Sequence, residues 1–134
     1  MPTNPPIAEE RLVAIVDDDA SVRQSARRLI RSFGYRAEAF GSAEEFLDSG
    51  QAKKTACLIL DVRMPRIDGL ELQRRLAGSA IPIVFITARA SEEEERRALQ
   101  AGAVAFLRKP VDKAALLHVL GAVLGTSESD GRKP

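Results

Sequence analysis

The chain has 134 residues, of which 45% are hydrophobic and only 4% aromatic, so we expect one compact domain with an aliphatic core. The 20 Lys and Arg nearly balance the 19 Asp and Glu, and the net charge of +1 excludes a general attraction to nucleic acid or to a membrane surface. The single cysteine excludes an internal disulfide and favours a buried thiol in a reducing cytoplasm. The sequence shows neither a signal-peptide layout nor an apolar run of membrane length, so we expect neither export nor membrane insertion.

The first half of the chain alternates predicted strands with predicted helices. Residues 12–16 are apolar throughout, which is typical of a strand buried on both faces. Residues 22–33 place apolar side chains on one helical face and end at Gly34, so they predict a helix that packs on a sheet. Residues 35–40 alternate polar and apolar side chains, as an edge strand does. The segment 42–47 opens with Ser and Glu spaced as a capping box and predicts a short second helix.

The second half of the chain repeats this alternation. In order, it predicts a strand at 57–60, a helix at 70–76, a strand at 83–86, a helix at 91–101, a strand at 106–108 and a helix at 112–124. Five strands that alternate with five helices imply parallel pairing, because each right-handed crossover needs a helix to return the chain. We therefore predict an α/β, doubly wound, five-stranded parallel sheet. Residues 11–125 would form this domain, with 1–10 as a flexible N-terminal segment and 126–134 as a C-terminal linker or tail.

Four of the predicted strands end at ionisable or hydroxyl side chains: Asp17-Asp18-Asp19, Asp61, Thr87 and Lys109. Ligands bind outside the carboxyl ends of the strands in such sheets, so we expect these groups to meet in one pocket. Carboxylates at close range repel one another strongly unless a cation lies between them. Oxygen ligands suit Mg²⁺, with Mn²⁺ as the alternative, and the one histidine, His118, is expected on the surface of the last helix.

A lysine and a hydroxyl beside such a pocket suit a phosphoryl group, whose oxygens need positive charge and hydrogen-bond donors. Asp61 would then be the nucleophile, and the product would be an aspartyl phosphate. Each residue alone has a plainer interpretation: a helix cap at 17–19, a turn at Asp61, a strand-end hydroxyl at Thr87 and a solvated charge at Lys109. Their joint placement at successive strand ends favours the phosphoryl site.

The residues around these positions resemble the receiver domain of two-component response regulators. The resemblance runs from about Leu12 to Leu124 and rests on Ile15-Val16-Asp17-Asp18-Asp19, on residues 60–69 (LDVRMPRIDG), on Ile86-Thr87-Ala88-Arg89 and on Leu107-Arg108-Lys109-Pro110. It implies the flavodoxin-like receiver fold with strand order 2-1-3-4-5. Three segments look closest to the subgroup of nitrogen-fixation and nodulation regulators: residues 64–69 (MPRIDG), the turn Ala101-Gly102-Ala103 and residues 106–110 (FLRKP).

The resemblance also implies a role for each site residue. Asp61 would accept the phosphoryl group, and Lys109 and Thr87 would contact its oxygens. Mg²⁺ would be held by Asp17, Asp18, Asp61 and the backbone carbonyl of Arg63. Thr87 and Phe106 would act as the switch residues, with a Lys109-Pro110 bond that is often cis.

The implied function is that of a switch rather than an enzyme. A sensor histidine kinase or phosphotransfer protein would phosphorylate Asp61, and the face formed by the fourth helix, fifth strand and fifth helix would control an output, transcription through a separate or removed DNA-binding domain. The resemblance leaves open a phosphorylation-dependent homodimer, and it implies no direct binding of nucleic acid or membrane by this domain. Glu92 with Arg96 and Glu93 with Arg97, four residues apart, predict ion pairs on a solvated helix face or a dimer contact.

Three rival functions fit the residues less well. A flavodoxin-like flavin carrier would hold phosphate on the first strand-to-helix loop, which is triply acidic here. An aspartate-nucleophile phosphatase would carry a second Asp two positions after Asp61, where this chain has Arg63. A degenerate receiver that acts only as an interaction module would have lost one of the five site residues, and all five are present.

Overall fold

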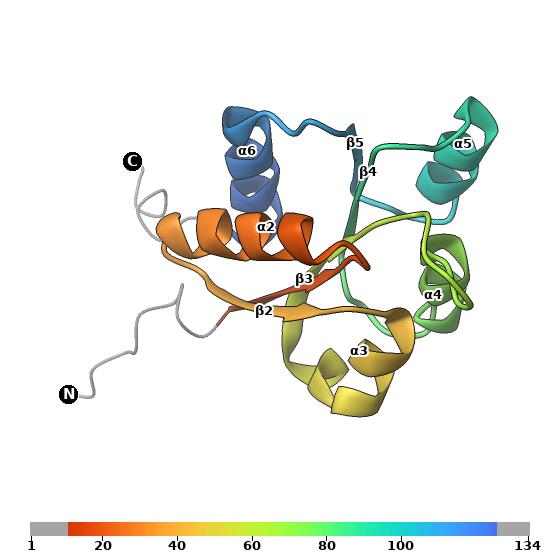
Figure 1. Ribbon diagram of the computed structural model, residues 1–134, viewed down its shortest axis with the longest axis horizontal. Coiled ribbons are helices and arrows are strands. Elements are labelled where there is room, and N and C mark those ends of the chain that lie inside the picture. Colours follow the sequence, from red (N-terminus) through yellow and green to blue (C-terminus); the bar gives the residue numbers. More distant parts are fainter. Residues whose placement is uncertain (1–10, 126–134) are drawn as a thin grey trace.

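The computed structural model describes residues 11–125, and the predicted terminal segments 1–10 and 126–134 lie outside the described residues (Figure 1). The strands are β1 (Leu12–Val16), β2 (Arg36–Phe40), β3 (Thr55–Leu60), β4 (Ile83–Thr87) and β5 (Ala105–Arg108). The helices are α2 (Ala20–Ser32), α3 (Ala43–Ser49), α4 (Gly69–Arg75), α5 (Glu92–Gln100) and α6 (Lys113–Leu124), with a 3₁₀ helix η1 (Gln51–Lys54) before β3.

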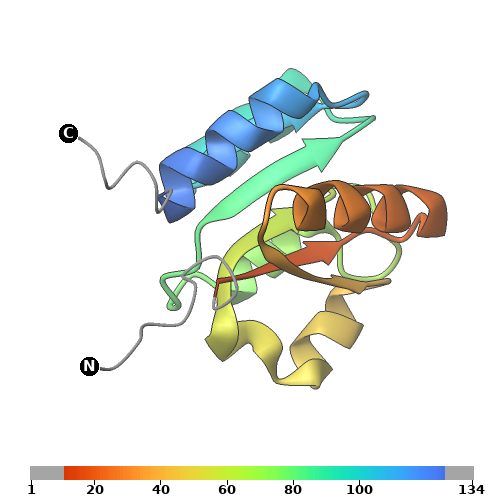
Figure 2. The ribbon, with the colours of Figure 1, turned by 90° about the vertical axis from the view of Figure 1, so that its left-hand side faces the viewer.

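The five strands form one parallel sheet in the order β2-β1-β3-β4-β5 (Figure 2). This confirms the predicted sheet, its strand order and its five helices. Several boundaries differ from the prediction. The strand β2 begins at Arg36 instead of Tyr35, β3 at Thr55 instead of Cys57 and β5 at Ala105 instead of Phe106. The helix α2 begins at Ala20, ahead of the predicted range 22–33, and η1 has no counterpart among the predicted elements. A single turn of 3₁₀ helix has no apolar periodicity of its own by which it could be recognised.

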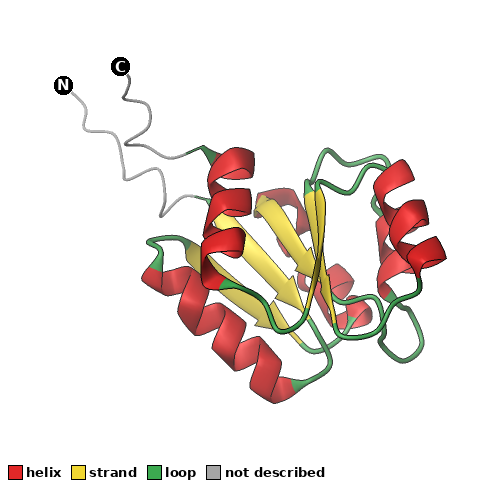
Figure 3. Ribbon diagram, turned by 90° about the horizontal axis from the view of Figure 1, so that it is seen from above, coloured by secondary structure: helices red, strands yellow, loops and turns green. Residues whose placement is uncertain are grey.

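Helices cover both faces of the sheet (Figure 3). On one face, α2 and α6 pack their apolar stripes, including Ile30 and Leu120, on strand residues such as Val13 and Ile59. On the other face, α3, α4 and α5 pack on the alternate strand residues. Successive side chains of a strand point to opposite faces, so β1 and β4, buried at every position, need apolar residues throughout. The continuous apolar runs of the sequence have this physical origin.

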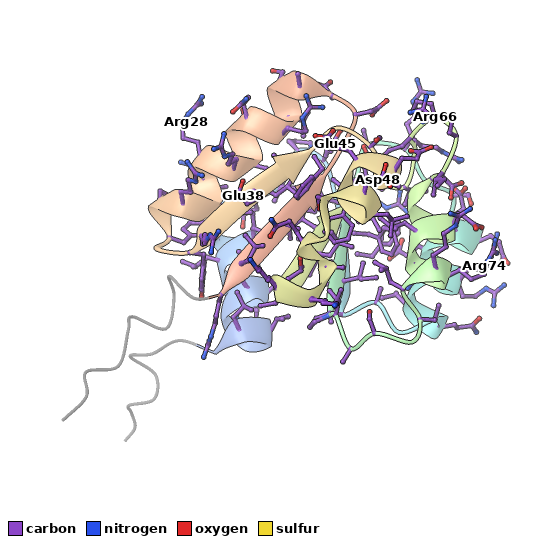
Figure 4. The ribbon with its side chains drawn as sticks, turned by 90° about the horizontal axis from the view of Figure 1, so that it is seen from below. Arg28, Glu38, Glu45, Asp48, Arg66 and Arg74 are labelled. Atoms are coloured by element: carbon purple, nitrogen blue, oxygen red, sulfur yellow. The ribbon has the colours of Figure 1, made fainter. Side chains whose placement is uncertain are left out.

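Apart from the buried Asp17 and Asp61, the charged side chains lie around this apolar interior. Figure 4 shows Arg28 on α2, Asp48 on α3 and Arg74 on α4 directed away from the sheet, and all three are exposed. Among the described residues, no helix is long and apolar enough to cross a lipid bilayer.

Polar side chains begin most of the helices. Asp19, Ser42, Asp68 and Asp112 each accept a hydrogen bond from a backbone N–H in the first turn that follows, and Ser91 with Glu94 forms a complete capping box. These caps fix where each strand-to-helix loop ends. The loops at the carboxyl edge of the sheet therefore have a defined geometry.

Candidate functional site

Two buried carboxylates follow adjacent strands at the carboxyl edge of the sheet. Val16 and Leu60 are in register, so Asp17 and Asp61 leave β1 and β3 side by side. The Asp61 backbone N–H donates to the Val16 carbonyl at 3.1 Å. Asp17 is 4% exposed and Asp61 is 7% exposed, whereas Asp18 faces solvent. A carboxylate oxygen from each of the three lies within 4.8 Å of the others, so the structure brings together the three acidic residues that the sequence assigned to one pocket.

Short loop contacts hold these carboxylates in place. Asp17 Oδ1 accepts a hydrogen bond from the Asp19 backbone N–H at 2.9 Å, and the Arg23 guanidinium donates to the Asp17 carbonyl at 2.9 Å. Asp61 Oδ1 accepts from the Arg63 backbone N–H at 3.2 Å. Asp19 caps α2, so the plainer interpretation of the acidic run applies to this third residue.

Lys109 reaches both buried carboxylates from the end of β5. Its Nζ lies 2.9 Å from Asp17 Oδ2 and 3.2 Å from Asp61 Oδ2. Its backbone N–H donates to the Thr87 carbonyl at 2.9 Å, and its peptide bond to Pro110 is cis. The cis bond agrees with what the resemblance implied for this position.

Burial and neighbouring charges shift the pKa values of Asp17 and Lys109. Burial raises the pKa of Asp17, and the nearby charge of Asp61 acts in the same direction, against the Asp19 N–H and Lys109. Burial alone lowers the pKa of Lys109, but the hydrogen bond and charge of Asp17, with the charge of Asp61, raise it overall. One ammonium group therefore contacts two buried carboxylates, with the carboxylate of Asp18 close to both, and its single charge does not neutralise all three.

This donor set fits a hard divalent cation. All the side-chain ligands are oxygens, no His or Cys is part of the described cluster, and the carboxylates are already pre-positioned by backbone N–H groups. Mg²⁺ prefers such oxygen ligands and retains several waters, which the exposed side of Asp18 can accommodate. The Arg63 N–H bond to Asp61 also places the backbone of Arg63 next to the cluster.

The side chains of the two predicted switch residues make their described contacts with other groups than the acidic cluster. Thr87 is fully buried, and its hydroxyl donates to the Arg89 carbonyl at 3.1 Å and accepts from the Arg89 N–H at 3.4 Å. Phe106 is half-buried, with its ring centroid 5.7 Å from that of Phe85. Within residues 11–125, no hydrogen bond joins Thr87 to Asp61. The Thr87 hydroxyl is engaged by its own loop.

Sequence reasoning missed several residues that shape the site. Gly69 lies beneath the acidic loop, where its N–H donates to Val62 at 2.9 Å and a Cβ atom would overlap the Asp61 carbonyl oxygen. The Arg63 side chain reaches across to Glu94 of α5 at 2.7 Å. A glycine at the first position of a helix after an Asp cap signals a close backbone approach, whereas the reach of Arg63 has no signal in the sequence.

The comparisons with known proteins agree with the fold. Residues 13–121 match the family of the response regulator receiver domain. The chain therefore belongs to the receiver domain family of two-component response regulators.

Two of the relatives belong to the predicted subgroup. The chain is 43% identical to nodulation protein W of Bradyrhizobium diazoefficiens over 91% of this chain and 53% of that protein. It is 37% identical to the transcriptional regulatory protein FixJ of Azorhizobium caulinodans over 90% of this chain and 58% of that protein. The chain thus spans about half the length of the curated relatives it matches. Their names support the nitrogen-fixation and nodulation subgroup.

Solved structures of receiver proteins share the fold of this chain. A response regulator receiver protein from Burkholderia phymatum is 47% identical, with a TM-score of 0.76 over 86% of this chain and 95% of that one. A receiver protein from Pseudomonas putida is 33% identical, with a TM-score of 0.79 over 86% of this chain and 98% of that one. In both cases nearly the whole of the solved chain is matched.

Proposed function

We propose that Asp61 is the phosphoacceptor of this receiver domain and that a sensor histidine kinase, a phosphotransfer protein or a small phosphodonor supplies the phosphoryl group. The observation that carries the proposal is the convergence of Asp61 with Asp17, Asp18 and Lys109 at one edge of the sheet. In transfer from a phosphohistidine, a carboxylate oxygen of Asp61 forms a bond to phosphorus as the phosphorus–nitrogen bond breaks, and the leaving imidazole retains that electron pair and takes up a proton. With a small donor such as acetyl phosphate, the phosphorus–oxygen bond breaks instead and acetate leaves with the electron pair.

Mg²⁺ fits the three carboxylates together with the Arg63 carbonyl, and when bound it would screen their charge from the incoming phosphoryl oxygens. Lys109 is already beside Asp61, with its pKa raised by its acidic neighbours, so it carries a full positive charge for a phosphoryl oxygen. Asp17 and Asp18 hold the cation and take no part in bond making. The domain is thus a switch that takes up and slowly loses one phosphoryl group.

The proposed signal begins at Thr87. A dianionic phosphoryl group on Asp61 would attract the Thr87 hydroxyl away from Arg89, and the Phe106 ring would turn inward behind it. The β4–α5 loop, α5, β5 and α6 then change their packing. This face would pass the signal to an output. The transcriptional regulator among the relatives suggests a DNA-binding domain, in the part of that protein that this chain does not span. Such a regulator would work in the cytoplasm and would not need this domain to touch nucleic acid or membrane.

We further propose a phosphorylation-dependent homodimer through this face. Large apolar side chains remain exposed on it at Leu99 of α5, Val104 before β5 and Leu117 of α6. Sedimentation of the domain with and without the phosphoryl analogue beryllium fluoride tests this. A second copy should join only with the analogue, and a monomer under both conditions would refute the dimer.

The phosphoacceptor is tested by intact-protein mass after incubation with acetyl phosphate, with and without Mg²⁺. Wild type should gain the mass of one phosphoryl group only with Mg²⁺. Asp61→Asn should gain none, because the near-isosteric amide keeps the packing and loses the nucleophile. Asp48→Asn, at an exposed position on α3, is the matched control and should be labelled like wild type. Labelling of Asp61→Asn at the wild-type level would refute the assignment.

A further inference from the structure

Arg108 makes three contacts with the elements that surround Thr87. It is the last residue of β5 and lies in register with Thr87 of β4. Its guanidinium carbon is 5.4 Å from the centroid of the Phe106 ring. One guanidinium nitrogen donates to the Ala90 carbonyl and another to Glu95 Oε1, both at 2.8 Å. A single side chain thus connects β5, the β4–α5 loop and the first turn of α5.

These contacts fix the loop that engages the Thr87 hydroxyl. Only residues 88–91 separate the end of β4 from the first residue of α5. Thr87 bonds to both backbone groups of Arg89, and the next residue, Ala90, is held by Arg108. For the Thr87 side chain to turn toward Asp61, its hydroxyl must break both hydrogen bonds to the backbone of Arg89. The backbone of a loop this short cannot rearrange at Arg89 while the Ala90 carbonyl stays fixed.

A purely structural role would give Arg108 little importance. Its side chain is 44% exposed and that of Glu95 is 35% exposed, and ion pairs of this kind add little to folding stability. All three partners, however, belong to the same switching face. A weak contact that exists in only one of two arrangements shifts the balance between them by its full free energy.

We propose that Arg108 is a positioning residue that retains the unphosphorylated arrangement of the β4–α5 loop and so opposes the movement of Thr87. This inference rests on the proposed phosphoacceptor function. Removal of Arg108 lowers the cost of the phosphorylated arrangement, so the domain binds a phosphoryl analogue more tightly. The guanidinium fork is needed, because a lysine offers one point charge and cannot reach the Ala90 carbonyl and Glu95 in the same way.

The test is the affinity of the domain for beryllium fluoride in the presence of Mg²⁺, measured by calorimetry. Arg108→Ala should bind about threefold to tenfold more tightly than wild type, from the loss of one exposed ion pair, one hydrogen bond and one cation–π contact. Arg108→Lys should show part of this gain. Loss of a positive charge alone weakens the binding of an anion, so a tighter complex cannot come from the change in net charge.

A charge exchange and a control separate this role from a general effect on packing. Arg108→Glu with Glu95→Arg keeps the net charge and restores an ion pair, and it should bind less tightly than Arg108→Glu alone. Arg96→Ala removes an exposed ion pair to Glu93 on the same helix and should bind like wild type. Circular dichroism verifies that every variant is folded.

The role of Arg108 and the phosphoacceptor function can be refuted separately. If wild type binds beryllium fluoride and is labelled on Asp61, but folded Arg108→Ala binds no more tightly, the role of Arg108 is refuted and the phosphoacceptor function stands. If wild type neither binds the analogue nor is labelled, the proposed function fails, and this inference fails with it.

Discussion

Gly69→Ala is expected to damage both the fold and the acidic site, because this residue has no room for a methyl group. A Cβ atom at Gly69 would overlap the carbonyl oxygen of Asp61 and lie 3.0 Å from Cε1 of Phe85. Gly69 and its Phe85 neighbour are both buried, so the opposing atoms cannot swing into solvent. The backbone at Asp61 itself must move.

The cost follows from this geometry. Overpacking of a tight core costs about 1–3 kcal/mol, and we expect the upper end here because the opposing atom belongs to the backbone. A domain of this size loses roughly 4 °C in Tm for each kcal/mol, so Gly69→Ala should lower Tm by about 10 °C. Displacement of the Asp61 carbonyl also moves the proposed nucleophile away from Lys109, so labelling by acetyl phosphate should slow even at temperatures where the variant is folded.

The assay is urea unfolding followed by circular dichroism, combined with the rate of mass gain from acetyl phosphate. Gly78→Ala is the matched control, since a Cβ at Gly78 meets nothing within 4 Å. It should change the free energy of unfolding by less than about 0.5 kcal/mol. If Gly69→Ala is as stable as Gly78→Ala and is labelled at the wild-type rate, the contact between Gly69 and the Asp61 carbonyl does not position the nucleophile, and this prediction is refuted.

Three further predictions concern the pocket and the core. Burial raises the pKa of Asp17, so the protein should lose stability as pH rises through the carboxyl range. At neutral pH and without divalent cations Asp17→Asn should therefore raise Tm, and its stabilisation by Mg²⁺ in thermal unfolding should be smaller than that of wild type. Burial raises the pKa of Cys57 to about 12, so the thiol should resist iodoacetamide at pH 8 in the native protein and react in urea; rapid native labelling would contradict this burial. Phe46→Ala should cost about 3–5 kcal/mol in urea unfolding, because the ring is fully buried between α3 and the sheet, and a loss below 1 kcal/mol would contradict its place in the core.

The fold could be predicted because a doubly wound sheet leaves a strong pattern. Strands such as β1 and β4 are buried on both faces and must be apolar throughout, and the caps at Ser42 and Ser91 begin helices where the sequence placed them. Parallel pairing then aligns the carboxyl ends of the strands. The meeting of Asp17, Asp61 and Lys109 followed from topology alone.

The details that depend on the reach of long side chains could not be predicted. Spacing paired Glu92 with Arg96 and Glu93 with Arg97, but Arg96 bonds to Glu93 three residues before it and to Gln100. Both arrangements are allowed on a helix, and rotamers decide between them. The contacts of Arg108 likewise arise from elements that are far apart in sequence. The direction of the Thr87 hydroxyl depends on the conformation of the β4–α5 loop. That conformation has no periodic pattern in the sequence from which it could be predicted.

The first and last described residues of the domain, Arg11 and Gly125, lie close together. The Arg11 guanidinium, just before β1, donates to the carbonyl of Gly125, just after α6, at 3.1 Å. Both points lie at the amino edge of the sheet, roughly 17 Å of strand away from Asp61. A neighbouring module joined at either point would start on the side remote from the chemistry. The domain could therefore be inserted into a surface loop of another protein with little distortion of either fold. The carboxyl edge of the sheet, where Asp61 lies, would stay accessible to the phosphodonor.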